Sequence, residues 1–192
     1  MSDRLSPQER IALLEIARQA INSVVQGNSL EPLDLAHLPL VLREEGASFV
    51  TLTIAGQLRG CIGALEAYQP LALDVQEHAV AAATEDYRFP PVSRQELPLI
   101  DIEISRLTPM KALDYSGFQE LLNKVRPGVD GVVLRDGIRR ATFLPQVWEK
   151  VSSKEEFFDH LCLKMGARQN LWREKQLSVW TYQVEEFNDE EK

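Results

Sequence analysis

The spacing of apolar residues predicts a long helix near the start of the chain. Ser6-Pro7-Gln8-Glu9 combines a serine N-cap, a proline at the first helical position and a glutamate at the capping-box position. Four apolar residues follow at helical spacing: Leu14, Ala17, Ile21 and Val24. Gly27-Asn28 then supplies a stop. We expect this helix to cover a sheet.

Alternation of apolar and polar residues predicts a hairpin and a third strand. Residues 49–54 alternate, Ala55-Gly56-Gln57 turns the chain, and residues 58–65 form the return strand. Residues 99–106 give the cleanest alternation, with Asp101 and Glu103 on one side and three isoleucines on the other. Such alternation is typical of a strand with one buried and one solvated face.

The remaining pattern mixes helices with further strands. Helices are predicted over residues 70–84, from Ser116 to before Pro127, and over 153–166. A hairpin is predicted over residues 132–143 around Asp136-Gly137, and a last strand over 177–184. Residues 188–192 form an acidic tail. No βαβ succession occurs, so we expect an α+β fold with antiparallel sheet.

Composition narrows the class of protein. The 192 residues carry a formal charge of −8, which argues against a nucleic-acid-binding protein with a broad basic surface. The first residues lack the apolar region of a signal peptide, and no apolar run reaches the length of a membrane span. The only two cysteines, Cys61 and Cys162, are typical of free thiols in a reducing compartment. We therefore expect a cytoplasmic globular protein.

The run Leu58-Arg59-Gly60-Cys61-Ile62-Gly63 is the strongest candidate for a site. On a regular strand Arg59, Cys61 and Gly63 would share one face, and a guanidinium beside a thiol favours the thiolate. Glycines in a strand often mark a close approach of a ligand or of another backbone. Cys61 is then a candidate nucleophile. A lone cysteine is more often a small packing residue, and no histidine is placed beside it by the sequence.

Other charged residues suggest weaker possibilities. Asp101 and Glu103 could act as general acid and base, although a solvated strand face is the commoner explanation. Arg88, Arg139 and Arg140, with Arg59, could form a pocket for a small anionic ligand such as a carboxylate or phosphate. The chain contains no motif with metal-ligand spacing and no glycine-rich phosphate loop, so we predict neither a metal site nor a cofactor.

Three motifs in order resemble the AMMECR-type domain family. They are Leu58-Arg59-Gly60-Cys61-Ile62-Gly63, Arg88-Phe89-Pro90-Pro91 and Arg140-Ala141-Thr142-Phe143-Leu144-Pro145-Gln146-Val147-Trp148. The match covers one domain, residues 5–187, and is similar to the compact prokaryotic form found in the AmmeMemoRadiSam system. The resemblance implies two unequal lobes, each an antiparallel sheet with flanking helices, and a cleft between the lobes that the first motif faces.

The family supplies no established catalytic residues, so two main functional hypotheses remain open, and nucleic-acid binding is a third that the acidic composition disfavours. In the first, the chain is an enzyme or a site-bearing enzyme component in which Cys61, helped by Arg59 and assisted by Asp101 or Glu103, binds or attacks an anionic substrate in the cleft. The genomic companions of similar proteins imply a modification pathway with Memo-like and radical S-adenosylmethionine proteins. Alternatively, the chain is a non-catalytic adaptor or ligand-binding module in which Cys61 serves packing. Either way, the candidate ligand-binding residues are Arg59, Gly60, Cys61, Gly63, Arg88 and Arg140.

Overall fold

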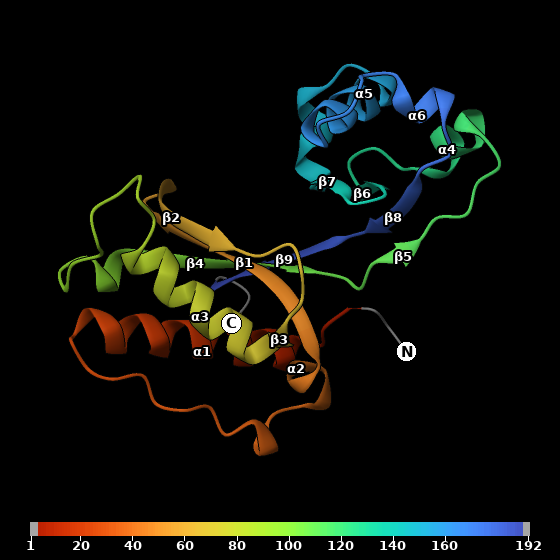
Figure 1. The fold of residues 1–192 in the computed structure, drawn as a ribbon. Helices are drawn as coiled ribbons and strands as arrows, with labels where there is room; N and C mark the ends of the chain where they lie inside the picture. Colours follow the sequence, from red (N-terminus) through yellow and green to blue (C-terminus); the bar gives the residue numbers. More distant parts are fainter. Residues whose placement is uncertain (1–3, 190–192) are drawn as a thin grey trace. The chain divides into compact units, whose positions relative to one another are not determined.

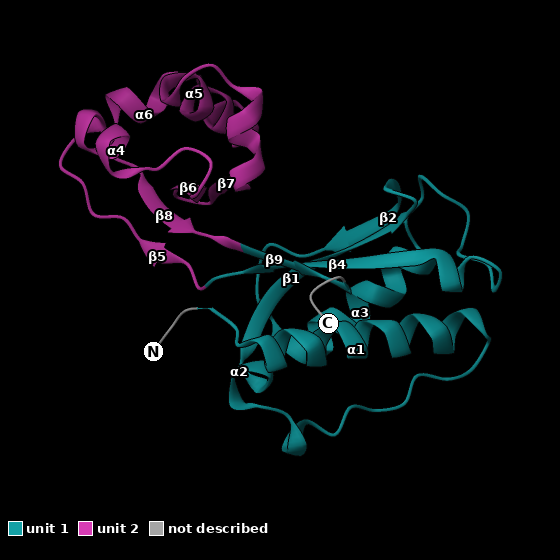
Figure 2. Cartoon of the chain, turned by 180° about the vertical axis from the view of Figure 1, so that it is seen from behind, with its two compact units in different colours: residues 1–108, 185–192 teal, residues 109–184 magenta. Residues whose placement is uncertain are grey.

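The computed structural model describes residues 4–189, which fall into two compact units (Figures 1 and 2). Unit 1 comprises residues 1–108 and 185–192, and unit 2 comprises residues 109–184. Unit 2 is therefore inserted between two segments of unit 1. Both units contain an antiparallel sheet and helices, so the predicted α+β class is confirmed.

Unit 1 is built around a sheet of five strands. The strands are β1 (Glu45–Ile54), β2 (Gln57–Gly63), β3 (Gln69–Pro70), β4 (Ile100–Leu107) and β9 (Val184–Asn188). Their order is β2-β1-β4-β9, with β3 paired to β1. The helices are α1 (Pro7–Val25), α2 (Leu40–Arg43) and α3 (Leu71–Thr84), with 3-10 turns η1 (Leu35–His37) and η2 (Leu97–Leu99).

Helices α1 and α3 pack on one face of this sheet (Figure 1). The strands direct their apolar positions to these helices, and Val50, Leu52, Ile102 and Ile104 are completely buried there. The predicted capping box of α1 is present, because Ser6 and Glu9 each accept the other's backbone N–H. Helix α3 begins one residue after the predicted start and ends where predicted.

Unit 2 contains a four-stranded sheet with an aromatic core. Its elements are β5 (Lys111–Ala112), α4 (Phe118–Lys124), β6 (Gly131–Asp136), β7 (Arg139–Phe143), η3 (Pro145–Lys150), α5 (Lys154–Lys164), α6 (Leu171–Glu174) and β8 (Ser178–Tyr182). The strand order is β5-β8-β6-β7. The Trp148 and Phe157 rings stack with centroids 3.6 Å apart, whereas the core of unit 1 is almost entirely aliphatic.

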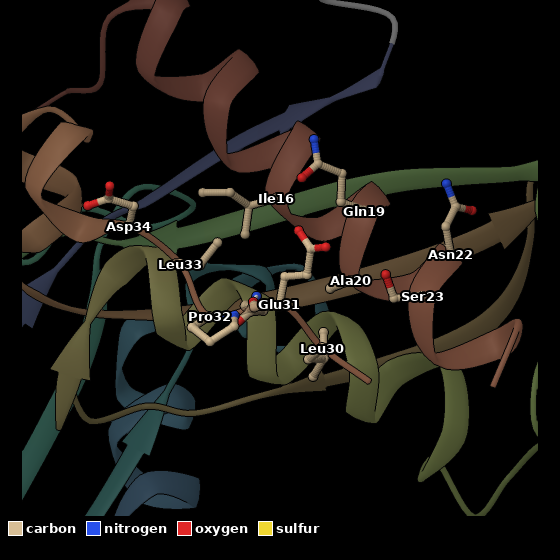
Figure 3. A pocket seen from close by; sticks show the side chains of 11 residues that line it. Ile16, Gln19, Ala20, Asn22, Ser23, Leu30, Glu31, Pro32, Leu33 and Asp34 are labelled. Atoms are coloured by element: carbon tan, nitrogen blue, oxygen red, sulfur yellow. Dashed lines mark hydrogen bonds between the residues drawn. The ribbon is translucent and has the colours of Figure 1, made fainter. Parts of the chain in front are cut away.

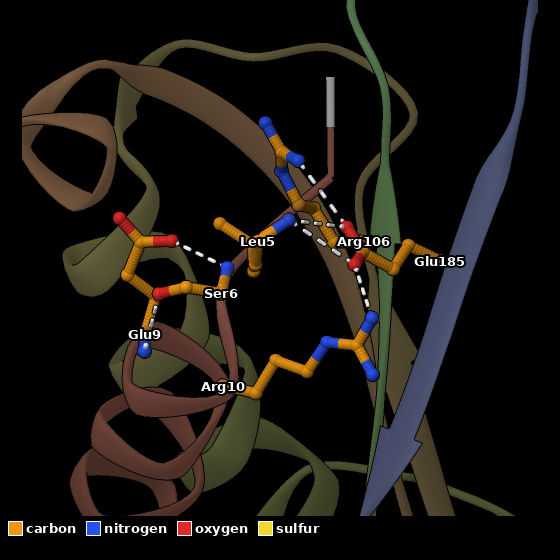
Figure 4. Close-up of polar contacts among 6 residues, drawn as sticks. All are labelled: Leu5, Ser6, Glu9, Arg10, Arg106 and Glu185. Carbon is orange, nitrogen blue, oxygen red and sulfur yellow. Dashed lines mark hydrogen bonds and ion pairs between the residues drawn. The ribbon is translucent and has the colours of Figure 1, made fainter. Parts of the chain in front are cut away.

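A buried carboxylate joins the start of the described chain to its last strand (Figure 4). Glu185 of β9 accepts the Leu5 backbone N–H with both oxygens, at 3.1 and 3.2 Å. Arg10 and Arg106 contribute guanidinium donors at 2.8 and 3.3 Å. A carboxylate that is 7% exposed requires such partners, because burying an unpaired charge is costly.

The structure corrects two predictions near the end of the chain. The single strand predicted over residues 177–184 is interrupted at Gln183, and β8 and β9 belong to different sheets. The predicted acidic tail begins too early, because Asn188 ends β9 and Asp189 accepts the Ile102 N–H at 3.0 Å. Residues 190–192 of that tail lie outside the described residues. The sequence does not mark where β9 ends and the tail begins, because no glycine or proline separates them.

Candidate functional site

Cys61 lies on the face of the unit 1 sheet opposite α1 and α3, which we call the outer face. Thr51 of β1 pairs with Cys61 on one side and with Glu103 of β4 on the other. The Thr51 hydroxyl donates a hydrogen bond to the Cys61 sulfur at 3.3 Å. All three side chains are partly exposed. We call Cys61, Thr51 and Glu103 the polar row.

Burial changes the proton affinity of the carboxyl in the polar row. Desolvation raises the pKa of Glu103 above its usual range, and the nearby charge of Glu186 raises it further. Cys61 on β2 and Glu103 on β4 lie on either side of β1. Because neighbouring strands are about 4.8 Å apart, the two backbones are separated by roughly 10 Å, and Thr51 lies between the thiol and the carboxyl. Asp101 is in the next row, opposite Thr53, and is exposed.

Arg59 does not follow the regular alternation that the sequence suggested. Thr53 pairs with Leu58 and Leu52 pairs with Gly60, so Arg59 is the extra residue of a β-bulge. Its guanidinium bonds the Glu96 carboxylate at 2.7 Å and the carbonyl of Pro90 at 2.8 Å. The prediction that Arg59 shares a regular strand face with Cys61 is therefore wrong, because the bulge redirects its side chain to the segment after α3.

A second arginine binds the backbone of the candidate cysteine. The Asp86 carboxylate accepts the Cys61 N–H at 2.8 Å, and Arg88 donates to the Cys61 carbonyl at 3.3 Å. Asp86 and Arg88 also pair with each other at 2.6 Å. That pairing holds the pKa of the buried Asp86 carboxyl far below its usual range, despite the opposing effect of burial.

The charges of these two arginines are balanced within unit 1. The Arg59 guanidinium, with the Ser93 N–H, lowers the pKa of Glu96 to about 2, and Arg88 faces Asp86. Arg140 lies in unit 2 on β7, where its guanidinium contacts the Met110 sulfur at 3.5 Å. The predicted grouping of Arg140 with the other two arginines into an anion pocket stays a prediction.

The two glycines of the motif are explained by close packing. A Cβ on Gly60 would lie 2.1 Å from the Ala82 carbonyl oxygen of α3. A Cβ on Gly63 would lie 2.4 Å from the Phe49 ring. A glycine in a strand marks the close approach either of a ligand or of another part of the protein. The second reason therefore accounts for both positions without a ligand.

Sequence reasoning missed a polar cluster beneath the sheet. Ser48 donates to the Asp74 carboxylate at 2.6 Å, and the His78 ring nitrogen Nδ1 lies 3.2 Å from the same oxygen. The spacing of Asp74 and His78, four residues apart on a helix, was the available signal. Within residues 4–189, no group of three or more histidine, cysteine or carboxylate side chains is placed to hold a metal ion.

The role of Thr51 could have been found by counting residue pairs back from the hairpin turn. A two-residue turn at Ala55-Gly56 places Ile54 opposite Gln57, and counting back brings Thr51 near Cys61. The bulge shifts that count by one residue, which the sequence does not announce. Glu96 stands at the capping-box position after Ser93, whose N–H it accepts at 2.8 Å, but nothing in the sequence pairs it with Arg59, and Asp86 carries no signal beyond its nearness to Arg88.

The comparisons with known proteins agree with this fold. The AMMECR1 family model matches residues 14–187. A protein of Methanothermobacter thermautotrophicus is 38% identical over 97% of both chains, and one of Thermofilum pendens is 36% identical over 96% of this chain and 91% of that one.

A solved structure extends the similarity to three dimensions. The crystal structure of the uncharacterized protein PH0010 from Pyrococcus horikoshii has a TM-score of 0.72 and 32% identity, covering 93% of this chain and 90% of that one. Within residues 4–189, none of the helices is long and apolar enough to cross a membrane. The match over nearly the whole length, in sequence and in structure, makes this chain a member of the AMMECR1 family.

Proposed function

We propose that the protein is a cytoplasmic, ligand-binding component of a modification pathway that includes a Memo-like protein and a radical S-adenosylmethionine protein. Family membership and the genomic companions of similar proteins support the pathway. The polar row supports the binding role, because it presents a thiol, a hydroxyl and a carboxyl on a sheet face that neither α1 nor α3 covers.

One observation carries the proposal: the Cys61 thiol is partly exposed and hydrogen-bonded, whereas Cys162 is completely buried. Burial also raises the pKa of the Cys162 thiol, which keeps it protonated and unreactive. The Glu103 carboxyl, with its raised pKa, can hold a proton closer to neutral pH than an ordinary glutamate. Cys61 and Glu103 could thus contact one ligand through different kinds of group.

For the ligand we propose a small polar molecule rather than a strong anion. The two arginines of unit 1 from which an anionic ligand was predicted are both paired, Arg59 with Glu96 and Arg88 with Asp86. An anion would have to compete with these charge-assisted hydrogen bonds. A polar ligand could instead use the Thr51 hydroxyl and the Glu103 carboxyl directly.

Thiol labelling tests the accessibility that this proposal needs. Cys162→Ser isolates Cys61, and Cys61→Ser isolates Cys162, so each thiol can be followed by mass after iodoacetamide treatment at pH 8. We expect the folded protein to be alkylated at Cys61 at least tenfold faster than at Cys162, because burial excludes the reagent from Cys162. Equal protection of both thiols until unfolding would contradict the proposal.

A binding experiment with the purified partner proteins tests the pathway separately. The chain is mixed with the purified Memo-like and radical S-adenosylmethionine proteins from the same genome, and complex formation is measured by analytical ultracentrifugation. We expect a complex that survives Cys162→Ser. If neither protein associates although iodoacetamide alkylates Cys61 as expected, the accessible site at Cys61 is retained and the pathway assignment is wrong.

A non-catalytic adaptor is the second candidate, and one residue favours it. Tyr87 is 94% exposed, although its neighbours Asp86 and Arg88 are held by the Cys61 backbone. Exposed aromatic residues on a fixed loop are common anchors at protein interfaces. If Tyr87→Ala weakens association more than tenfold and Cys61→Ser leaves it unchanged, the adaptor is the correct function.

A further inference from the structure

A pocket of about 430 Å³ lies in unit 1, between the second half of α1 and the chain segment that follows it (Figure 3). Its volume is within the range of small-molecule sites. The segment is tied down at two places: the Gln76 side chain of α3 donates to the Glu31 carbonyl at 3.3 Å, and Leu33 packs against the core. The pocket therefore has a fixed outer wall.

The pocket combines an apolar floor with one polar wall. Ile16 and Ala20 of α1 form the floor together with Leu33. Gln19, Asn22 and Ser23 line the wall, since residues three and four apart share a helix face. Among the described residues, these three side chains have no hydrogen-bond partner, so their donors and acceptors are available to a ligand.

The charge of the lining is negative only. No lysine, arginine or histidine is among the described residues that line the pocket, whereas Glu31 and Asp34 are. Asp34 already accepts the Ala36 N–H at 3.1 Å and lies 2.7 Å from the His37 ring. The Glu31 carboxylate has no partner within residues 4–189, and its side chain extends toward α1 in Figure 3.

We propose that this pocket binds a small organic ammonium ion with an aliphatic chain, such as a short polyamine. The Glu31 carboxylate would pair with an ammonium group, and the amide oxygens of Gln19 and Asn22 would accept its N–H donors. The methylene groups would lie on Ile16 and Ala20. The net charge of −8 attracts such a cation from solution.

Titration of the full chain with spermidine in 150 mM NaCl, followed by amide NMR shifts, tests the site. We expect saturable binding with shifts at Ala20 and Leu33, and binding about tenfold weaker in Glu31→Gln, the effect of losing one charged hydrogen bond. Glu15→Gln is the matched control, because it removes the same charge from an exposed position of α1 outside the pocket. It should change affinity less than twofold.

A neutral probe separates charge recognition from simple apolar filling. We expect 1,8-octanediol to bind at least tenfold more weakly than spermidine, because it lacks the ammonium that pairs with Glu31. Absence of saturable spermidine binding overturns the proposal. Equal weakening by Glu15→Gln and Glu31→Gln also overturns it, since that result indicates diffuse attraction by the whole surface.

Discussion

The two faces of the unit 1 sheet differ in what their side chains can do. The face under α1 and α3 buries aliphatic side chains such as Leu52 and Ile102 completely. The outer face, from the same strands, carries Thr51, Cys61 and Glu103 in partly exposed positions. Adjacent residues of one strand therefore serve stability and candidate function separately. Substitutions at neighbouring positions should separate the two roles.

The largest effect should come from the buried face. Leu52→Ala removes buried methyl groups and leaves a cavity, so we expect a loss of about 2–5 kcal/mol in the free energy of unfolding. Thr51→Val, its neighbour on the outer face, should cost less than about 1 kcal/mol. Urea unfolding measures both. Similar losses from both variants would contradict the assignment of the two faces.

Gly60→Ala should have the next largest effect. The new Cβ would approach the Ala82 carbonyl oxygen to 2.1 Å, and a backbone atom cannot rotate away as a side chain does. We expect a loss of about 1–3 kcal/mol, typical of overpacking. The same urea experiment applies. A loss below about 0.5 kcal/mol would mean that β2 and α3 are not in such close contact.

A smaller effect should depend on pH at the edge of the sheet. Because the pKa of Glu96 is about 2 in the folded protein, against 4.5 ordinarily, its contribution is complete above pH 4.5 and declines as the pH falls toward 2. Glu96→Gln should cost about 1 kcal/mol at pH 7. Unfolding measured between pH 7 and 3 should show a smaller acid loss in Glu96→Gln than in the parent protein.

Glu103 should show the opposite sign and the smallest effect. The pKa of Glu103 is raised on folding. Its carboxyl therefore lowers the free energy of unfolding of the protein as the pH rises through the unfolded and then the folded pKa. Glu103→Gln should therefore stabilise the protein at pH 7, by less than about 1 kcal/mol, and the gain should vanish at pH 4. Destabilisation at pH 7 would show that the carboxylate forms favourable contacts on the outer face.

The sequence was sufficient for elements with a strong local signal. The capping box at Ser6, the alternation around Ile102 and the hairpin turn at Gly137 each depend on a few neighbouring residues, and each is confirmed. The bulge at Arg59 was missed, because it depends on how two strands pair and not on the composition of either one. A single extra residue was enough to redirect a candidate site residue.

The candidate site was harder to predict for the same reason. The sequence singled out Cys61 and Glu103, but only strand pairing shows that Thr51 lies between them. The partners of Arg59 and Arg88 come from the segment after α3, and no periodic pattern marks that segment. Long-range polar contacts of this kind depend on the tertiary fold. The predicted cleft between lobes stays a prediction.

The insertion of unit 2 between β4 and β9 also sets an order of events during synthesis. Among the strands of residues 4–189, β9 is translated last, and its Glu185 follows every residue of unit 2, yet Glu185 binds the Leu5 backbone. Domains generally fold as they emerge from the ribosome. We therefore expect unit 2 to complete its aromatic core while unit 1 still exposes the edge of β4. During that interval the nascent chain has an unpaired strand edge, the feature by which proteins most readily aggregate.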